Sequence, residues 1–301
     1  MRLIVAGVVL ASMPVMVSCG SKASRQAKAI TEAIENAEEG TGLKVKANAL
    51  ADTVLNIDGR KVQFCDVARI FEVDEEGDFY LSVRAIVPAA ESEVTADLYN
   101  KVSEYFSAII EPDTVTAVVA DTPAEFAAGL DEMGREFVAT VTPMAEDAET
   151  AGYMMDVDIR PVYGKSGYTT YAVYADFYTG GAHGTVDTYF ETYDNATSVP
   201  YSFESMFTPE GQREARVKLV EAIAGDKGMS VDEYLVSVND FVMPDEPITV
   251  ENFPVYHVGI TGLGVVFTYP KYSIAAGFEG CPAYVLGFDD VSGLLVEALR
   301  D

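Results

Sequence analysis

One histidine lies in a glycine-rich segment that could bind a ligand. His183 is preceded by Gly180 and Gly181 and followed by Gly184. Glycine allows positive φ angles and lets backbone amides approach a bound group, so this loop could present the imidazole to a ligand. The alternative is that the glycines supply the angles of a tight turn and that His183 holds the turn through a local hydrogen bond. The sequence favours this alternative and leaves ligand binding as a hypothesis.

Acidic side chains near this loop could form a site for a divalent cation together with His183. They are Asp176, Asp187 and Glu191. The chain has 48 acidic residues, so such neighbours also arise by chance. With 2 histidines and 3 cysteines, it cannot build the usual histidine-rich or four-cysteine metal sites. We therefore expect no metal and no cofactor.

The motifs of several enzyme classes are missing. There is no Gly-x-Ser-x-Gly elbow and no His-Glu-x-x-His pattern. Gly164-Lys165-Ser166 has the form of the end of a phosphate-binding loop, but Ile159 stands where the first glycine is required, which indicates a turn. A glycosidase needs only two well-placed carboxylates, and Asp289 and Asp290 are one pair among many. Catalysis stays open, and a non-catalytic role is favoured.

Tyrosines recur at strand spacing in the same part of the chain. Tyr174 and Tyr178 share one face of a predicted strand, and Tyr189 and Tyr193 share one face of the next. An exposed aromatic ladder would suit sugar rings. The alternative, which we favour, is that these tyrosines fill half-buried sheet faces.

The N-terminus carries a targeting signal. Residues 1–18 hold one positive charge, Arg2, and then an apolar run, a pattern typical of a secretory signal peptide rather than a membrane span. Met16-Val17-Ser18-Cys19-Gly20 resembles a bacterial lipobox, in which the cysteine is lipidated and becomes the mature N-terminus. We predict that the lipid on Cys19 is the only membrane attachment. Residues 19–45 would then be a tether, and the protein would lie in the cell envelope, on the outer membrane facing the periplasm or the cell surface.

Two cysteines follow this signal, Cys65 and Cys281. Disulfides persist outside the cytoplasm, and a bond here would join the two halves of the chain and contribute about 2–5 kcal/mol. Two buried free thiols are the alternative. We expect the disulfide.

The hydrophobic pattern predicts an α+β fold. Antiparallel sheets with helices packed on one face are expected, in two associated modules over residues 46–150 and 151–301. Pro112 and Pro143 are expected to bound the first two helices. The expected helices cover 94–110, 124–140, a segment after Thr208, a shorter one from Ser230, and 291–299; the expected strands lie in hairpins within 54–64, 71–83 and 253–269, and at 115–119, 153–163, 168–178 and 185–193.

The charge balance excludes one class of partner. The 48 acidic residues against 20 basic ones give a formal net charge of -28. A chain this acidic repels the phosphate backbone of nucleic acids and anionic lipid surfaces. Nucleic acid is therefore excluded, and a basic partner is favoured because opposite charges steer the encounter.

Two ordered blocks in the second half carry a resemblance to a known family. The first is Phe177 to Gly184, followed by Phe190 to Asp194 and Tyr201 to Phe207; the second is Leu263 to Ala275, with the pattern Phe-x-x-Pro-x-Tyr-x-Ile-Ala. These blocks resemble the C-terminal extracellular domain of RsiV-type proteins. The match covers about residues 153–298, and residues 50–140 look like the companion N-terminal module.

The resemblance implies binding in the envelope. The family occurs in anti-sigma factors that sense lysozyme, beside the catalytic domain of peptidoglycan deacetylases such as PdaC, and in many bacterial lipoproteins. Its members are mostly non-catalytic. In the lysozyme sensors the domain occupies the enzyme's cleft, and the Pro-x-Tyr positions correspond here to Pro270 and Tyr272. Because no anti-sigma segment or transmembrane helix is recognised, only envelope binding is carried over.

The expected function is that of a lipid-anchored cell-envelope protein with a non-catalytic binding role. Its ligand would be peptidoglycan or another glycan, or a cationic protein such as lysozyme. Two alternatives stay open: a glycan-processing hydrolase that uses a carboxylate pair, and a structural partner in an envelope complex. The candidate ligand-binding residues are Tyr178, Gly180, Gly181, His183, Gly184, Tyr189, Pro270 and Tyr272.

Overall fold

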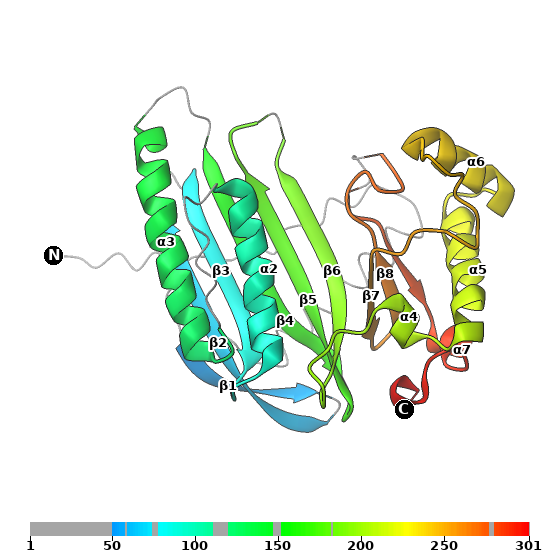
Figure 1. Cartoon of the computed structure of the whole chain (residues 1–301), viewed down its shortest axis with the longest axis horizontal. Coiled ribbons are helices and arrows are strands. Elements are labelled where there is room, and N and C mark those ends of the chain that lie inside the picture. The colour runs from blue at the N-terminus through cyan, green and yellow to red at the C-terminus, as the bar shows by residue number, and fades with distance from the viewer. Residues whose placement is uncertain are drawn as a thin grey trace.

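The computed structural model describes residues 50–57, 59–73, 78–110, 120–146, 152–181, 183–276 and 280–300. Within them the chain forms a six-stranded sheet and a three-stranded sheet, each packed with helices (Figure 1). The predicted α+β class is confirmed. The predicted signal peptide, Cys19, the tether and the strand at 115–119 lie outside the described residues.

The secondary structure elements are numbered along the chain. The strands are β1 (Leu50–Ile57), β2 (Arg60–Glu72), β3 (Phe79–Pro88), β4 (Tyr153–Gly164), β5 (Tyr168–Tyr178), β6 (Thr185–Asp194), β7 (His257–Thr261), β8 (Gly264–Thr268) and β9 (Ala283–Leu286). The helices are α2 (Glu93–Ile109), α3 (Pro123–Ala145), α4 (Phe203–Met206), α5 (Pro209–Asp226), α6 (Val231–Val242), α7 (Phe288–Val291) and a 3-10 helix at Glu297–Leu299. No helix in the described part of the chain has the length and apolar character needed to cross a bilayer.

The large sheet has the strand order β1-β2-β3-β4-β5-β6. Its pairs are antiparallel except β3 with β4, which are parallel because α2 and α3 form the crossover between them. Val83, Val157 and Ala175 are aligned across β3, β4 and β5 and face these two helices. Figure 1 shows α2 and α3 lying across this face of the sheet.

The large core extends across the expected module boundary. Strands β1 to β3 come from residues 46–150 and strands β4 to β6 from residues 151–301, yet they form one sheet. Phe126 of α3 and Tyr193 of β6 are both fully buried in the same core. The expected boundary lies in the chain between α3 and β4 and does not separate two sheets.

Two expected helix boundaries are wrong. Helix α3 continues through Pro143 to Ala145, because a proline in the last turn removes only one backbone hydrogen bond and the fully buried Val141 holds this turn in the core. The expected helix over 291–299 is interrupted. Leu295 instead forms a β-bridge with Phe207, and this tertiary pairing leaves only short helices on either side.

The expected disulfide between Cys65 and Cys281 is not formed. Both cysteines are free, and the thiol of Cys281 donates a hydrogen bond to the carbonyl oxygen of Val186 on β6 (3.1 Å). Cys65 lies on β2, four strands away, which is roughly 19 Å at about 4.8 Å per strand. A disulfide requires Cα atoms within about 7 Å. The strand order therefore keeps the two thiols apart.

The small sheet, β7-β8-β9, packs with α5 and α6 around a second core. It meets the large sheet at β6, where Phe190 points away from α2 and contacts Val266 of β8. A Cβ atom placed on Gly259 of β7 would lie 2.6 Å from Cβ of Phe190. The buried hydroxyl of Thr192 accepts a hydrogen bond from the Ile260 amide (2.9 Å). A glycine and a threonine thus set how closely β7 approaches β6.

Gly259→Ala is expected to lower the free energy of unfolding by about 1–3 kcal/mol, because the new methyl group overlaps the backbone and Cβ of Phe190. Urea unfolding followed by circular dichroism measures this change. Gly225→Ala is the control. Gly225 lies in α5, and no atom lies within 4 Å of the place that a methyl group would take, so the alanine is expected to stabilise the protein by about 0.5–1 kcal/mol. Equal effects of the two substitutions would contradict the close approach of β7 to β6.

Candidate functional site

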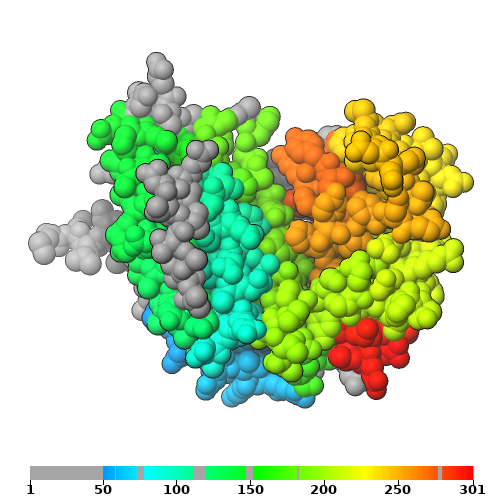
Figure 2. All heavy atoms as spheres, in the orientation of Figure 1, coloured from blue at the N-terminus to red at the C-terminus, as the bar shows by residue number. Residues whose placement is uncertain are grey.

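Two of the predicted segments meet at one cavity beside β6. The cavity has a volume of about 370 Å³ and is lined by Tyr105 of α2, Phe177 of β5, residues 183–187 and residues 270–272. We call it the β6 cavity. In the space-filling view, atoms of the green strands lie between α2, in cyan, and the orange part of the second core (Figure 2). The predicted site residues in its lining are His183, Gly184, Pro270 and Tyr272.

The other four predicted residues lie outside this lining. Tyr178 is aligned with Met154 on the face of the sheet opposite α2. Gly180 has a φ of 79°, the positive angle that the turn interpretation assigns to this glycine, and Gly181 is exposed. Tyr189 is buried, with 4% of its surface exposed.

The side chain of Tyr272 is held outward by a strained turn. Tyr272 has a φ of 70° and is 61% exposed. The amide and the hydroxyl of Ser273 both donate hydrogen bonds to the carbonyl oxygen of Pro270, at 3.1 and 2.7 Å, and close the turn. The Lys271 ammonium lies 5.4 Å from the centre of the Tyr272 ring. A non-glycine residue in this backbone region is destabilising, and such residues cluster at functional sites.

Tyr105 and Asp187, which line the β6 cavity, belong to a network of aromatic and acidic side chains. The hydroxyl of Tyr105 donates a hydrogen bond to Asp187 (2.7 Å), and Tyr105 is also hydrogen-bonded to Tyr189. The ring of Tyr189 stacks on His257, with centroids 4.1 Å apart and an angle of 18° between planes. Burial lowers the pKa of His257, although Asp187 and Glu191 oppose this, so the imidazole is neutral at pH 7.

A second set of contacts fixes α2 against β6. The Lys101 ammonium lies 3.0 Å from Glu191 and 3.5 Å from Asp97, and the Tyr193 hydroxyl lies 2.7 and 2.5 Å from the same two carboxylates. Burial lowers the pKa of Lys101, but Glu191 and Asp97 outweigh it and the pKa is raised, so the ammonium stays charged. Helix α2 is thereby held in place to position Tyr105.

Sequence reasoning missed Tyr105. This residue belongs to a polar stripe on α2, with Asp97, Lys101 and Tyr105 at intervals of four residues. Such a stripe on a helix with an apolar opposite face predicts a polar partner, and that partner is β6. The four-residue spacing of these polar residues is the sequence signal that could have identified Tyr105.

The predicted tyrosines do not form a single exposed ladder. Tyr189 and Tyr193 are buried on the side of α2, at 4% and 0% exposure. Tyr174 is aligned with Thr188 on the opposite face. The half-buried interpretation of these tyrosines therefore holds for β6.

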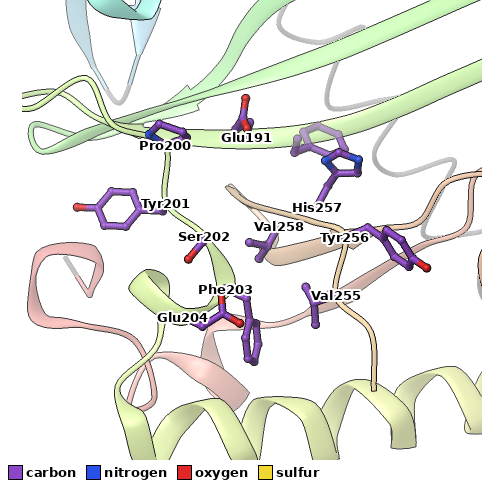
Figure 3. Close-up of a pocket in the computed structure, with 11 residues that line it drawn as sticks. Glu191, Pro200, Tyr201, Ser202, Phe203, Glu204, Val255, Tyr256, His257 and Val258 are labelled. Carbon is purple, nitrogen blue, oxygen red and sulfur yellow. The ribbon is translucent and has the colours of Figure 1, made fainter. Parts of the chain in front are cut away.

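A second cavity of about 230 Å³ lies further along β6 (Figure 3). Val255, Val258 and Phe203 line it below the β6 ribbon in this view, with Glu204 beside Phe203. Glu191 points away from them, which agrees with its contact to Lys101 on the other side of the strand. This cavity contains none of the predicted site residues. Its lining consists of Phe190, Glu191, residues 200–204 and residues 255–258.

The acidic residues near His183 are not brought together. Asp187 bonds to Tyr105, Glu191 to Lys101, and Asp176 lies on the opposite face of the sheet. In the part of the chain that the structure describes, no group of three or more His, Cys, Asp or Glu side chains is placed to hold a metal ion.

One pair of carboxylates lies side by side on two neighbouring strands. Asp156 of β4 and Asp176 of β5 are aligned on the face opposite α2, outside the linings of both cavities. Burial raises the pKa of both carboxyl groups, and their mutual repulsion adds to the shift at Asp156. The Ser82 hydroxyl and Arg160 act in the opposite direction at Asp156.

The fold is similar to that of solved proteins without an assigned activity. No protein-family model and no curated protein matches the chain. A DUF3298 family member from Bacteroides fragilis has a TM-score of 0.53 and 17% identity, covering 84% of this chain and 96% of that chain. A DUF3298 family protein from Pseudomonas aeruginosa has a TM-score of 0.46 and 16% identity, covering 78% and 94%. The structural neighbours are thus DUF3298 family proteins, and the likeness is one of fold.

Asp156→Asn is expected to stabilise the protein at neutral pH. The folded-state pKa of Asp156 is raised, so its stabilising contribution is complete below the unfolded pKa of about 3.9 and is lost as the pH rises through the folded pKa. The neutral amide avoids this loss. Thermal unfolding from pH 4 to 8 should therefore show an advantage of the variant at pH 7–8 that shrinks toward pH 4.

Asp194→Asn is the control with the opposite sign. Hydrogen bonds from the Thr197 and Ala196 amides lower the pKa of Asp194, so its stabilising contribution is present above the unfolded pKa and is lost as the pH falls through the folded pKa. This variant should be less stable than the wild type at pH 7, and the difference should vanish in acid. Parallel pH profiles of the two variants would contradict the assignment.

Proposed function

We propose that this protein is a cell-envelope protein, anchored by a lipid on Cys19, that captures a cationic protein through the β6 cavity. Tyr272 is the anchor that enters a cleft of the partner. The observation that carries the proposal is the outward display of Tyr272 on a strained turn at the rim of the cavity.

The geometry of Tyr272 supports an anchor role. Exposed tyrosines contribute strongly to binding because they bury a large area with few rotatable bonds. Here the two hydrogen bonds from Ser273 to Pro270 fix the backbone turn that carries Tyr272 before binding. A turn that is formed before binding loses less conformational entropy when a partner covers it. The resemblance to the lysozyme-sensing domains implies the same role for Pro270 and Tyr272.

The charge of the protein supports a cationic partner. A formal net charge of -28 attracts basic proteins over a Debye length and speeds their encounter. Asp187 places one carboxylate in the cavity itself. Attraction of this kind weakens as salt increases, which makes the proposal accessible to a salt series.

Tyr272→Ala is expected to weaken binding to purified lysozyme about thirtyfold or more, the effect of removing an anchor worth about 2 kcal/mol. Surface plasmon resonance at low ionic strength measures the Kd, and kon should fall as the salt concentration is raised. Tyr256→Ala is the matched control, because Tyr256 is 50% exposed and lies outside the lining of the β6 cavity. Muropeptides serve as the probe for the glycan ligands.

Tyr272→Gly separates binding from stability. Glycine adopts a φ of 70° without strain, so this variant should unfold with a free energy about 1 kcal/mol higher while binding lysozyme as weakly as the alanine variant. Lack of saturable lysozyme binding by the wild type, or equal losses in the Tyr272 and Tyr256 variants, would overturn the proposal. Saturable binding of muropeptides alone would replace the cationic protein by a glycan.

Cys19→Ser is expected to abolish lipid attachment. In a bacterium that processes lipoproteins, the wild type should incorporate labelled palmitate and fractionate with membranes, since the thiol of Cys19 is the acceptor. The serine variant should remain unlabelled. Cys281→Ser is the control and should label as the wild type does. Palmitate on the Cys19 variant would rule out this anchor.

A further inference from the structure

Large apolar side chains are exposed along helix α6 and at its C-terminal end. Helix α6 lies at the outer end of the second core, remote from α2 and α3 (Figure 1). Val236 is 62% exposed and Met243 is 80% exposed. We call the exposed set the α6 surface: Met229, Val236, Phe241, Val242 and Met243.

Val236 lies on the side of α6 that faces away from the core. Met229 precedes the first residue of α6 and Met243 follows the last, so an exposed methionine lies at each end of the helix. Helix α6 uses its other side for the core, where Tyr234 and Val238 are buried. The outer side of α6 therefore presents Val236 among Asp232, Glu233 and Asp240, with the exposed methionines at its two ends.

Hydrogen bonds hold the C-terminal end of α6 and the loop that follows it. Asn239 donates hydrogen bonds to the carbonyl oxygens of Leu235 and Ile248 and accepts one from the Ile248 amide (2.7 Å), which ties the following loop to the helix. Met243 ends the helix with a φ of 50°, and its amide bonds to the carbonyl oxygen of Asn239. Glycine is the residue that this position favours. A strained methionine with an exposed side chain contributes nothing visible to folding, and strain of this kind points to a role outside the fold.

The segment that carries the α6 surface is acidic. From residue 228 to residue 270 the chain has no lysine or arginine. A second copy of this protein would therefore meet repulsion here, whereas a cationic partner would be attracted. The exposed acidic residues on α6 and in the loop after it are Asp232, Glu233, Asp240, Asp245 and Glu246.

We propose that the α6 surface docks a cationic amphipathic helix, a second binding activity separate from the β6 cavity. The apolar face of such a helix would cover Val236 and Met243, and its lysines or arginines would pair with the surrounding carboxylates. Methionine side chains adapt to different apolar partners, which suits a surface that recognises amphipathic character rather than one sequence.

The probe is a labelled Leu/Lys peptide of about 18 residues, long enough for five helical turns. A scrambled peptide of the same composition lacks the continuous apolar face. Fluorescence anisotropy with the wild-type protein should give saturable binding of the amphipathic peptide and a Kd about tenfold weaker or more for the scrambled one, because only the former buries apolar area on α6.

Val236→Ser and Met243→Gly together should weaken binding of the amphipathic peptide about tenfold, with no change in net charge. The glycine relaxes the backbone at Met243, so the single variant Met243→Gly should lose affinity without losing thermal stability. Val199→Ser with Leu263→Ser is the control, since both residues are exposed and lie outside the α6 surface. Tyr272→Ala should bind the peptide as the wild type does.

The outcomes of the peptide-binding experiment either support or overturn the proposal. Reduced affinity in the α6 variants and unchanged affinity in both controls would support the proposal. Equal binding of the two peptides would identify attraction by net charge alone and overturn it. Loss of peptide binding in the Tyr272 variant would place the peptide at the β6 cavity and also overturn it, without affecting the proposed capture of lysozyme.

Discussion

The contact between β7 and β6 is the constraint on which the arrangement of the molecule depends. Gly259 allows the two strands to approach until β7 touches the backbone of Phe190, and Thr192 satisfies the buried amide of Ile260 at the same place. Any larger side chain at residue 259 would push the small sheet away. The Pro270–Tyr272 turn follows β8, the partner of β7, so this contact also brings the turn to the edge of β6. Gly259 thus helps to place the turn that lines the β6 cavity.

A chain with so few basic residues uses some of them inside the structure. Arg84 and Asp66 form a buried ion pair on the large sheet, with an Nε to Oδ1 distance of 3.1 Å. Lys101 joins α2 to the Glu191 carboxylate of β6. Such pairs offset the cost of burying carboxylates rather than adding net stability. The long-range field of the protein is negative because acidic residues outnumber basic ones by 48 to 20, and both proposed partners are cationic.

The two proposed binding surfaces share one physical feature. Tyr272 and Met243 are large, exposed residues on backbone with positive φ, where glycine would be more stable. In each case neighbouring hydrogen bonds fix the strained turn: Ser273 donates to Pro270 in one, and Asn239 exchanges hydrogen bonds with the backbone of Ile248 in the other. Local sequence preference and structure usually agree in a folded protein, and disagreements tend to mark functional positions. We therefore attribute the strained backbone at these two residues to a role in binding rather than in folding.

The sequence by itself determined what depends on near neighbours. The helix that begins after Ser230, the hairpin of β1 with β2, and the strands β4 to β6 are all found as predicted, since caps, turns and strand periodicity act over a few residues. The approximate position of the cavity also followed from two segments, 183–184 and 270–272.

Only the tertiary structure decided how these pieces combine. It joined six strands across the expected boundary, separated Cys65 from Cys281, and brought Tyr105 to Asp187. It also replaced an expected C-terminal helix by a bridge between Leu295 and Phe207. Each of these outcomes rests on contacts between residues far apart in the chain, which no local pattern encodes. Local patterns do not encode these outcomes because strand order and close packing depend on the whole core at once.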